Sequence, residues 1–180
     1  MLGLTLSTLL GSAIAQEPVW SEWRYAAPFA HPGGAAAIGT AHAPEEGLPL
    51  MGLDGDGPDL GAAMPGGSGG RDLRWETFQV NPAPDGWFDT GVIYLLNELE
   101  VTRMDNACAY MYRSVQCSAD MDLPVTMGSD DSLRLWLNGE IVHEFIGTRK
   151  VNIRQDEVVL PLKAGKNHLL VKVIQGGAGW

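Results

Sequence analysis

The sequence predicts an all-β fold, an antiparallel β-sandwich or jelly roll with a long Gly/Pro-rich N-terminal loop. Short alternating segments separated by turns follow one another from residue 71 to the end of the chain, and no ten-residue stretch there has a helical period. The 23 Gly and 11 Pro among 180 residues are high for a helical protein and normal for turn-rich β-structure. Short strands at regular spacing are typical of a sandwich.

Each predicted strand has its own alternating run of side chains. In the run from Ala107 to Val115, for example, Cys108, Tyr110 and Tyr112 point to one face and the intervening residues to the other. The strand over 121–127 contains Pro124, which is best tolerated at a sheet edge or at a bulge. The expected strands are 20–25, 72–80, 107–115, 121–127, 133–137, 140–145, 157–162 and 168–174. The apolar run 91–96 is either a further strand or, over 95–99, a short helical turn.

The strongest local signal is Asn138-Gly139 between two alternating runs. This dipeptide favours a two-residue type I′ turn, because both central positions need a positive φ. The turn predicts a hairpin in which Trp136 pairs with Ile141 and Leu135 with Val142. Both faces of this hairpin then carry apolar pairs, so we expect it inside a sandwich or under a covering loop.

The chain divides into three segments by composition. Residues 1–15 have no charged side chain, are rich in Leu and end in Ala13-Ile14-Ala15, which predicts a signal peptide; a buried N-terminal strand is the alternative. Residues 16–70 are expected to form a strand and a long surface loop, because 31–70 contain 12 Gly and 5 Pro but also regularly placed apolar anchors. Residues 71–180 form the predicted body of the sandwich.

Charge and cysteine content narrow the class of protein. A formal net charge of −10 argues against nucleic-acid binding, and no segment is long and apolar enough to span a membrane. With a signal peptide, the expected location is secreted, periplasmic or cell-surface. Cys108 and Cys117 lie on one predicted strand, about 30 Å apart when extended, so we expect two buried free thiols rather than a disulfide.

The C-terminal half contains a specific resemblance. The block from Met127 to Glu140 (MGSDDSLRLWLNGE) resembles the GSDDG-x-x-x-W-x-NG block of sugar-binding-type β-sandwich modules. Residues 154–173 resemble the D-x-x-x-V-x-L-K-x-G-x-N-x-L-L-x-K-V run of the same modules, and residues 176–180 resemble their closing GG-x-GW. Such modules, related to protective-antigen-like and galactose-binding-like jelly rolls, are typical of secreted multidomain proteins of planctomycete-like bacteria.

The resemblance implies a non-catalytic accessory module that positions a larger protein on a glycan or cell-surface polymer. The alternative is a structural or protein–protein interaction module of a cell-surface assembly with no sugar site. We expect no enzyme activity, since no nucleophile–base pair or opposed carboxylate pair is readable in the sequence. The family continues for one more strand beyond Trp180, so we expect the last strand to be missing and other domains of a longer parent protein to be partners.

Asp130 and Asp131 are the candidate metal ligands. In some protective-antigen-like lectins an adjacent Asp pair at this place binds Ca²⁺, which then binds sugar hydroxyls, so the resemblance implies a possible Ca²⁺ site. Carboxylate oxygens suit this hard cation, although it needs six to eight oxygen ligands. The alternative is that Asp130 caps the turn through the local backbone.

Trp87 and Trp180 are the candidate sugar-stacking residues. Carbohydrates stack on exposed aromatic rings, and Trp87 lies in the turn Asp85–Asp89; folding back as a loop anchor is equally open for it. Trp75 and Trp136 alternate with polar residues and are expected in the core. Other polar residues are interpreted as surface, hairpin or turn residues without metal-ligand spacing, namely His31, His42, His143, His168, Glu45, Glu46 and the Asp54–Asp59 loop.

Overall fold

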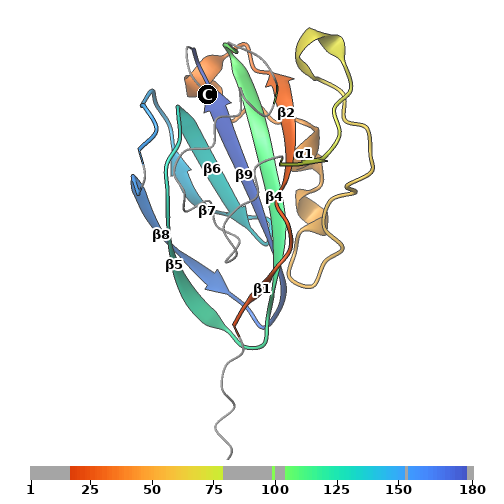
Figure 1. The fold of residues 1–180 in the computed structure, drawn as a ribbon, viewed down its shortest axis with the longest axis vertical. Helices are drawn as coiled ribbons and strands as arrows, with labels where there is room; N and C mark the ends of the chain where they lie inside the picture. The colour runs from red at the N-terminus through yellow and green to blue at the C-terminus, as the bar shows by residue number, and fades with distance from the viewer. Residues whose placement is uncertain (1–16, 79–98, 100–103, 153, 178–180) are drawn as a thin grey trace, which may run out of the picture.

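A computed structural model describes residues 17–78, 99, 104–152 and 154–177. It confirms the all-β fold: the strands pair antiparallel, and the helices are single short turns (Figure 1). The strands are β1 (Val19–Trp20), β2 (Arg24–Ala30), β3 (Glu76–Thr77), β4 (Ala107–Cys117), β5 (Met121–Met127), β6 (Ser132–Leu137), β7 (Glu140–Phe145), β8 (Asp156–Leu162) and β9 (Gly165–Gln175). The short helical turns are η1 (Gly34–Ala37), α1 (Ala43–Glu46), η2 (Leu48–Leu50) and η3 (Ser68–Gly70).

The strands form a large sheet and a small one. The large sheet has the order β3-β2-β4-β9-β6-β7, with β1 also pairing with β4, and the small sheet is β5 paired with β8. The centre of the large sheet is the long pair β4 and β9, which are paired over all of Ala107–Cys117. Pro124 lies on β5, whose one partner among the described strands is β8, so its predicted edge position is confirmed.

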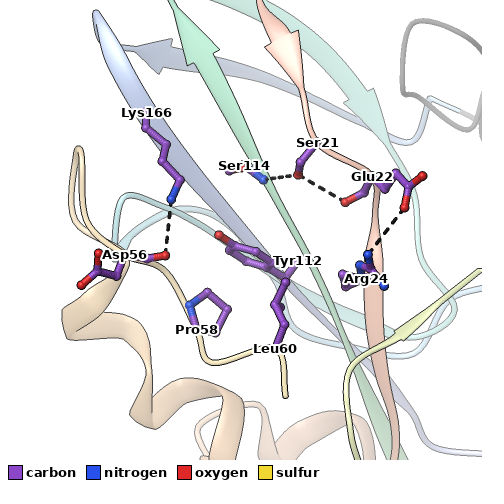
Figure 2. Close-up of a pocket in the computed structure, with 9 residues that line it drawn as sticks. All are labelled: Ser21, Glu22, Arg24, Asp56, Pro58, Leu60, Tyr112, Ser114 and Lys166. Carbon is purple, nitrogen blue, oxygen red and sulfur yellow. Dashed lines mark hydrogen bonds and ion pairs between the residues drawn. The ribbon is translucent and has the colours of Figure 1, made fainter. Parts of the chain in front are cut away.

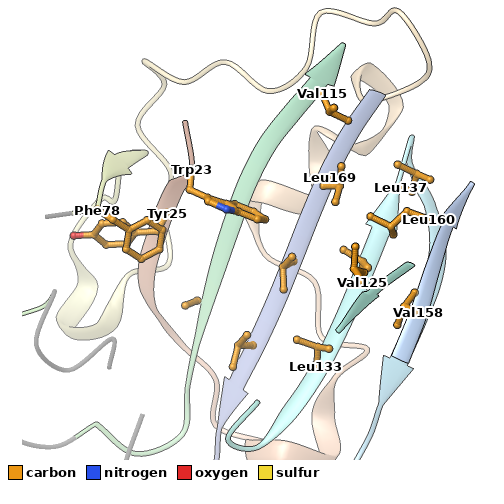
Figure 3. Packing of buried hydrophobic residues seen from close by; sticks show 14 of the residues in the cluster. Trp23, Tyr25, Phe78, Val115, Val125, Leu133, Leu137, Val158, Leu160 and Leu169 are labelled. Carbon is orange, nitrogen blue, oxygen red and sulfur yellow. The ribbon is translucent and has the colours of Figure 1, made fainter. Parts of the chain in front are cut away.

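One core lies between the two sheets. Leu133 and Leu137 of β6 and Leu169 of β9 face Val158 and Leu160 of β8 across this space (Figure 3). The alternation of β9 explains this directly, since Leu169, Val171 and Val173 share one face of an extended strand.

A second core lies on the opposite face of the large sheet, under residues 31–75. Cys108, Tyr110 and Tyr112 of β4 point to this side, and the segment covers them with apolar anchors. These anchors are Ile38, Met51, Met64, Leu73 and Trp75. The Gly/Pro-rich segment thus acts as a third layer without regular sheet structure, and Figure 1 shows it beside β2 and β4. Trp75 and Trp136 are buried, as predicted.

The hairpin register is partly different from the prediction. Asn138 and Gly139 have φ of 52° and 85°, as a type I′ turn requires, and Trp136 pairs with Ile141. Leu135, however, pairs with His143, because the register shifts between Leu135 and Trp136. A bulge of this kind adds one residue to a strand, and sequence alternation alone does not place it.

Two other strands differ from their predicted bounds. The expected strand 20–25 is two strands, β1 and β2, separated at Ser21–Trp23. The expected strand 72–80 is wrong over 72–75, where the described sheet pairing is limited to an isolated bridge between Met64 and Leu73 before β3 begins. Residues 79–80 and the apolar run 91–96 lie outside the described residues. Apolar alternation there reflects anchoring of the covering segment rather than a ladder of hydrogen bonds.

Cys108 and Cys117 are both buried and free, as predicted, and they stand at opposite ends of β4. No helix among the described residues is long and apolar enough to cross a membrane. Residues 1–15, predicted as a signal peptide, lie outside the described residues.

Candidate functional site

A pocket of about 250 Å³ opens between the covering segment and the strands β2, β4 and β9 of the large sheet (Figure 2). Four parts of the chain supply its walls: residues 21–24, which follow β1 and begin β2, the loop over 56–60, residues 112–114 of β4, and Lys166 of β9. Its lining residues are Ser21, Glu22, Arg24, Asp56, Pro58, Leu60, Tyr112, Ser114 and Lys166. The pocket therefore combines two carboxylates, two cations and hydroxyl groups with two small apolar side chains.

Strand pairing positions one wall. The amide of Ser114 donates to Oγ of Ser21 at 2.9 Å, and the amide of Ser21 donates to the carbonyl of Ser114 at 2.9 Å. Arg24 lies next along the chain, with its guanidinium 3.6 Å from the carboxylate of Glu22 and donating to Thr77 at 2.9 Å. These contacts hold Ser21, Glu22 and Arg24 in place beside β4 and β3.

The opposite wall is held by contacts between the start of β9 and the loop over 54–57. The amide of Lys166 donates to Oδ1 of Asp54 at 2.8 Å, and its ammonium donates to the carbonyls of Gly55 and Asp56 at 3.3 Å each. Gly57 has φ +81°, and a Cβ at that position would lie 2.5 Å from the hydroxyl of Tyr112. Glycine is therefore required for the loop to approach β4 this closely.

Tyr112 forms the buried base of the pocket. Nε2 of His168 lies 3.0 Å from the carbonyl of Gly55, which can only accept, so Nε2 carries the proton. Nδ1 then accepts from the Tyr112 hydroxyl at 2.7 Å. Burial raises the pKa of Tyr112 to about 12 and lowers the pKa of His168, so both groups are neutral at pH 7.

The structure places Asp130 and Asp131 away from this pocket, at the entry to β6. Oδ1 of Asp131 accepts from the amide of Arg149 at 3.0 Å, and Oδ2 accepts from the amide of Gly176 at 2.8 Å. Burial, together with the charge of Asp131, raises the pKa of Asp130. Asp131 thus connects two loops by hydrogen bonds, a role that turn propensity did not indicate. Ca²⁺ binding by Asp130 and Asp131 stays a prediction.

Trp87 and Trp180, the predicted stacking residues, lie outside the described residues. The pocket lining was not predicted from the sequence, because its members come from four distant segments with no shared spacing. One signal was available: the alternation of β4 places Tyr112 on the face that the covering segment contacts.

The sequence interpretation of several polar residues as surface groups is wrong. His31 and His168 are buried, and Glu45, on α1 of the covering segment, turns its carboxylate toward the sheet, where it accepts from Lys172 at 2.8 Å and from the hydroxyl of Tyr110. Lys172 is fully buried in the middle of an apolar strand pattern. A charge that is paired and hydrogen-bonded can be buried, which hydropathy patterns do not reveal.

Comparison of the chain with known protein families, with curated proteins and with solved structures found no match in any of the three. The structure therefore defines this protein by its fold: it is an antiparallel β-sandwich with a polar pocket.

Proposed function

We propose that this protein is an exported, non-catalytic carbohydrate-binding-like module that positions a larger protein on a glycan or surface polymer. The pocket beside β4 is the observation that supports the proposal most. Sugar ligands need several hydrogen-bond donors and acceptors close together, and an apolar surface for their C–H groups. Glu22, Arg24, Asp56 and Lys166 supply the first requirement, and Leu60 contributes to the second.

The pocket size fits a single small unit of a polymer rather than an enclosed ligand. Its volume of about 250 Å³ is below the range of about 300–1,000 Å³ that is usual for pockets enclosing drug-sized ligands. Opposite charges are balanced within it, which favours a neutral polyhydroxyl ligand over a strongly charged one. A terminal or side-branch sugar residue meets both conditions.

Glycan-array and polysaccharide pull-down measurements test the proposal. Asp56→Ala and Glu22→Ala remove exposed pocket carboxylates and are expected to leave the fold intact while weakening binding about tenfold or more, as loss of a charged hydrogen bond does. Asp122→Ala is the matched control, because Asp122 is an exposed carboxylate on β5 of the small sheet. A well-folded protein that binds no glycan, or binding that neither pocket variant changes, would disprove the assignment.

A second candidate function is a protein–protein interaction module of a surface assembly. It is favoured by β7, which ends the described part of the large sheet and carries exposed Ile141, followed by exposed Ile146. Val159 on the neighbouring β8 is also exposed. Apolar side chains at an open sheet edge are typical of association sites. Sedimentation velocity on the wild type and on Ile141→Lys tests the case in which the partner is a second copy of this chain, since the added charge should then abolish self-association.

A further inference from the structure

Three potential metal ligands meet under the covering segment. A nitrogen of His31, a nitrogen of His42 and Sγ of Cys108 all lie within 4.8 Å of one another. His31 and Cys108 are buried and His42 is half-buried. The three residues are far apart in sequence, which is why their spacing predicted no site.

Strand pairing brings His31 to Cys108. In the β2–β4 register Phe29 lies opposite Cys108 and Ala30 opposite Ala107, and the amide of His31 donates to the carbonyl of Asn106 at 2.7 Å. Residue 31 therefore leaves the sheet beside the start of β4, where the side chain of Cys108 points into the covered face.

His42 reaches the same point from the covering segment. It immediately precedes α1, and its ring packs against those of Phe29 and His31, with centroids 5.1 Å and 5.3 Å apart. Nδ1 of His31 and Nε2 of His42 are 3.0 Å apart. Two nitrogens at this separation can both reach an ion at the usual distance of about 2.0–2.1 Å.

The tautomer of His31 is fixed by a neighbouring carbonyl. Its Nε2 lies 3.1 Å from the carbonyl oxygen of Ala37, so Nε2 carries the proton and Nδ1 presents its lone pair to the cluster. A ligand histidine whose second nitrogen donates to a backbone carbonyl is a common arrangement in metal sites. In the metal-free protein the Nε2 proton of His42 donates to that lone pair.

We propose that His31, His42 and Cys108 bind a divalent transition-metal ion of Zn²⁺ type. Two imidazoles and a thiolate are ligands that this borderline-soft ion prefers over Mg²⁺ or Ca²⁺, which take oxygen. Three protein ligands leave one position of a tetrahedral ion for water or another donor. The ion enters from the side of half-buried His42.

Binding requires a defined proton balance. The thiol of Cys108 loses its proton to solvent and becomes the thiolate ligand, while the ring proton of His42 moves from Nε2 to Nδ1. One proton is therefore released for each ion bound. The adjacent ammonium of Lys172 is paired with the carboxylate of Glu45 at 2.8 Å, so the two neighbouring charges offset each other.

Titration of the full chain, free of any histidine tag and stripped with a chelator, tests the proposal. Calorimetry with Zn²⁺ should show one site, and Co²⁺ should give a thiolate-to-metal charge-transfer band together with ligand-field bands of a tetrahedral ion. His42→Gln and Cys108→Ser should weaken Zn²⁺ binding about 100-fold or more, since even outer-shell changes cost about 10–100-fold.

The chain provides matched controls. Cys117→Ser removes the other buried thiol and His143→Ala removes a histidine of β7, and neither should change the affinity. If Cys108→Ser does not fold, two measurements still test the site: the Zn²⁺ affinity of His42→Gln, which changes a half-buried residue, and the thiolate-to-Co²⁺ charge-transfer band of the wild type. If the wild type shows no Zn²⁺ site with a Kd below about 1 mM, the proposal is wrong. It is also wrong if both ligand variants retain the site at unchanged affinity.

Discussion

The buried ammonium of Lys172 gives the sharpest test of how the covering segment is held. It is fully buried on β9 and donates to the carbonyl of Ile38 at 3.0 Å, the carbonyl of Thr40 at 2.6 Å and the carboxylate of Glu45 at 2.8 Å. All three acceptors belong to the segment that covers the sheet. One side chain thus fixes that segment at three points.

Lys172→Met keeps a side chain of similar length but leaves the Glu45 carboxylate without its cation. Removing one partner of a buried pair costs about 3–5 kcal/mol of unfolding free energy. Since about 1 kcal/mol shifts the melting temperature of a chain this size by about 2–4 °C, we expect a decrease of about 6–20 °C. Urea titration at pH 7 measures the free energy and differential scanning calorimetry the melting temperature.

Two further variants identify the cause. Lys163→Ala breaks an exposed pair with Asp120, whose side chains are 52% and 61% exposed, and should cause no resolvable change. The double variant Lys172→Met/Glu45→Leu removes both charges and should recover part of the loss, although two carbonyls still lack their donor. A Lys172→Met protein within about 1 kcal/mol of the wild type would refute this account of the covering segment.

Three other predictions concern the sheets. The hydrogen bonds from Arg149 lower the pKa of Asp156. The ionised carboxylate therefore contributes stability above its unfolded pKa of about 3.9, and this contribution is lost as the pH falls through the folded pKa. When the urea midpoint is measured against pH, Asp156→Asn should show a smaller decrease at acidic pH than the wild type. Gly139→Ala places a Cβ at φ +85° and should cost about 1 kcal/mol or more by urea titration, and an unchanged midpoint would contradict the assigned turn. Leu160→Ala should cost about 2–5 kcal/mol, whereas Val159→Ala, its exposed neighbour on β8, should stay within about 0.5 kcal/mol; equal losses would mean that β8 does not cover the core.

The strand pattern could be predicted because it depends on local periodicity. The alternation of Ala107–Cys117 and the turn at Asn138-Gly139 are each contained in about ten residues, and the structure has both. The bulge at Val142 of β7 could not be predicted, since it depends on how β7 pairs with a β6 strand whose register with β9 is unbroken.

The candidate sites depended on contacts between distant parts of the chain. In the sequence, Tyr112 and Lys166 could be recognised only as members of a strand and of a turn. The pocket forms because residues 54–60 are held against both of them in the fold. His42 and Cys108 are separated by 66 positions, which no metal-ligand spacing pattern includes.

The sequence alone determined the β class, the acidic charge, the central strands and the two reduced cysteines, because local periodicity, composition and chain geometry govern these. The tertiary structure decided which face each strand presents to which layer, and that the glycine-rich segment buries Lys172 of the sheet and its own His31 and pairs Lys172 with its own Glu45. The physical reason is that burial of a charge or an imidazole is stabilised only by a partner in a precise position. That position is set by folding, not by spacing along the chain.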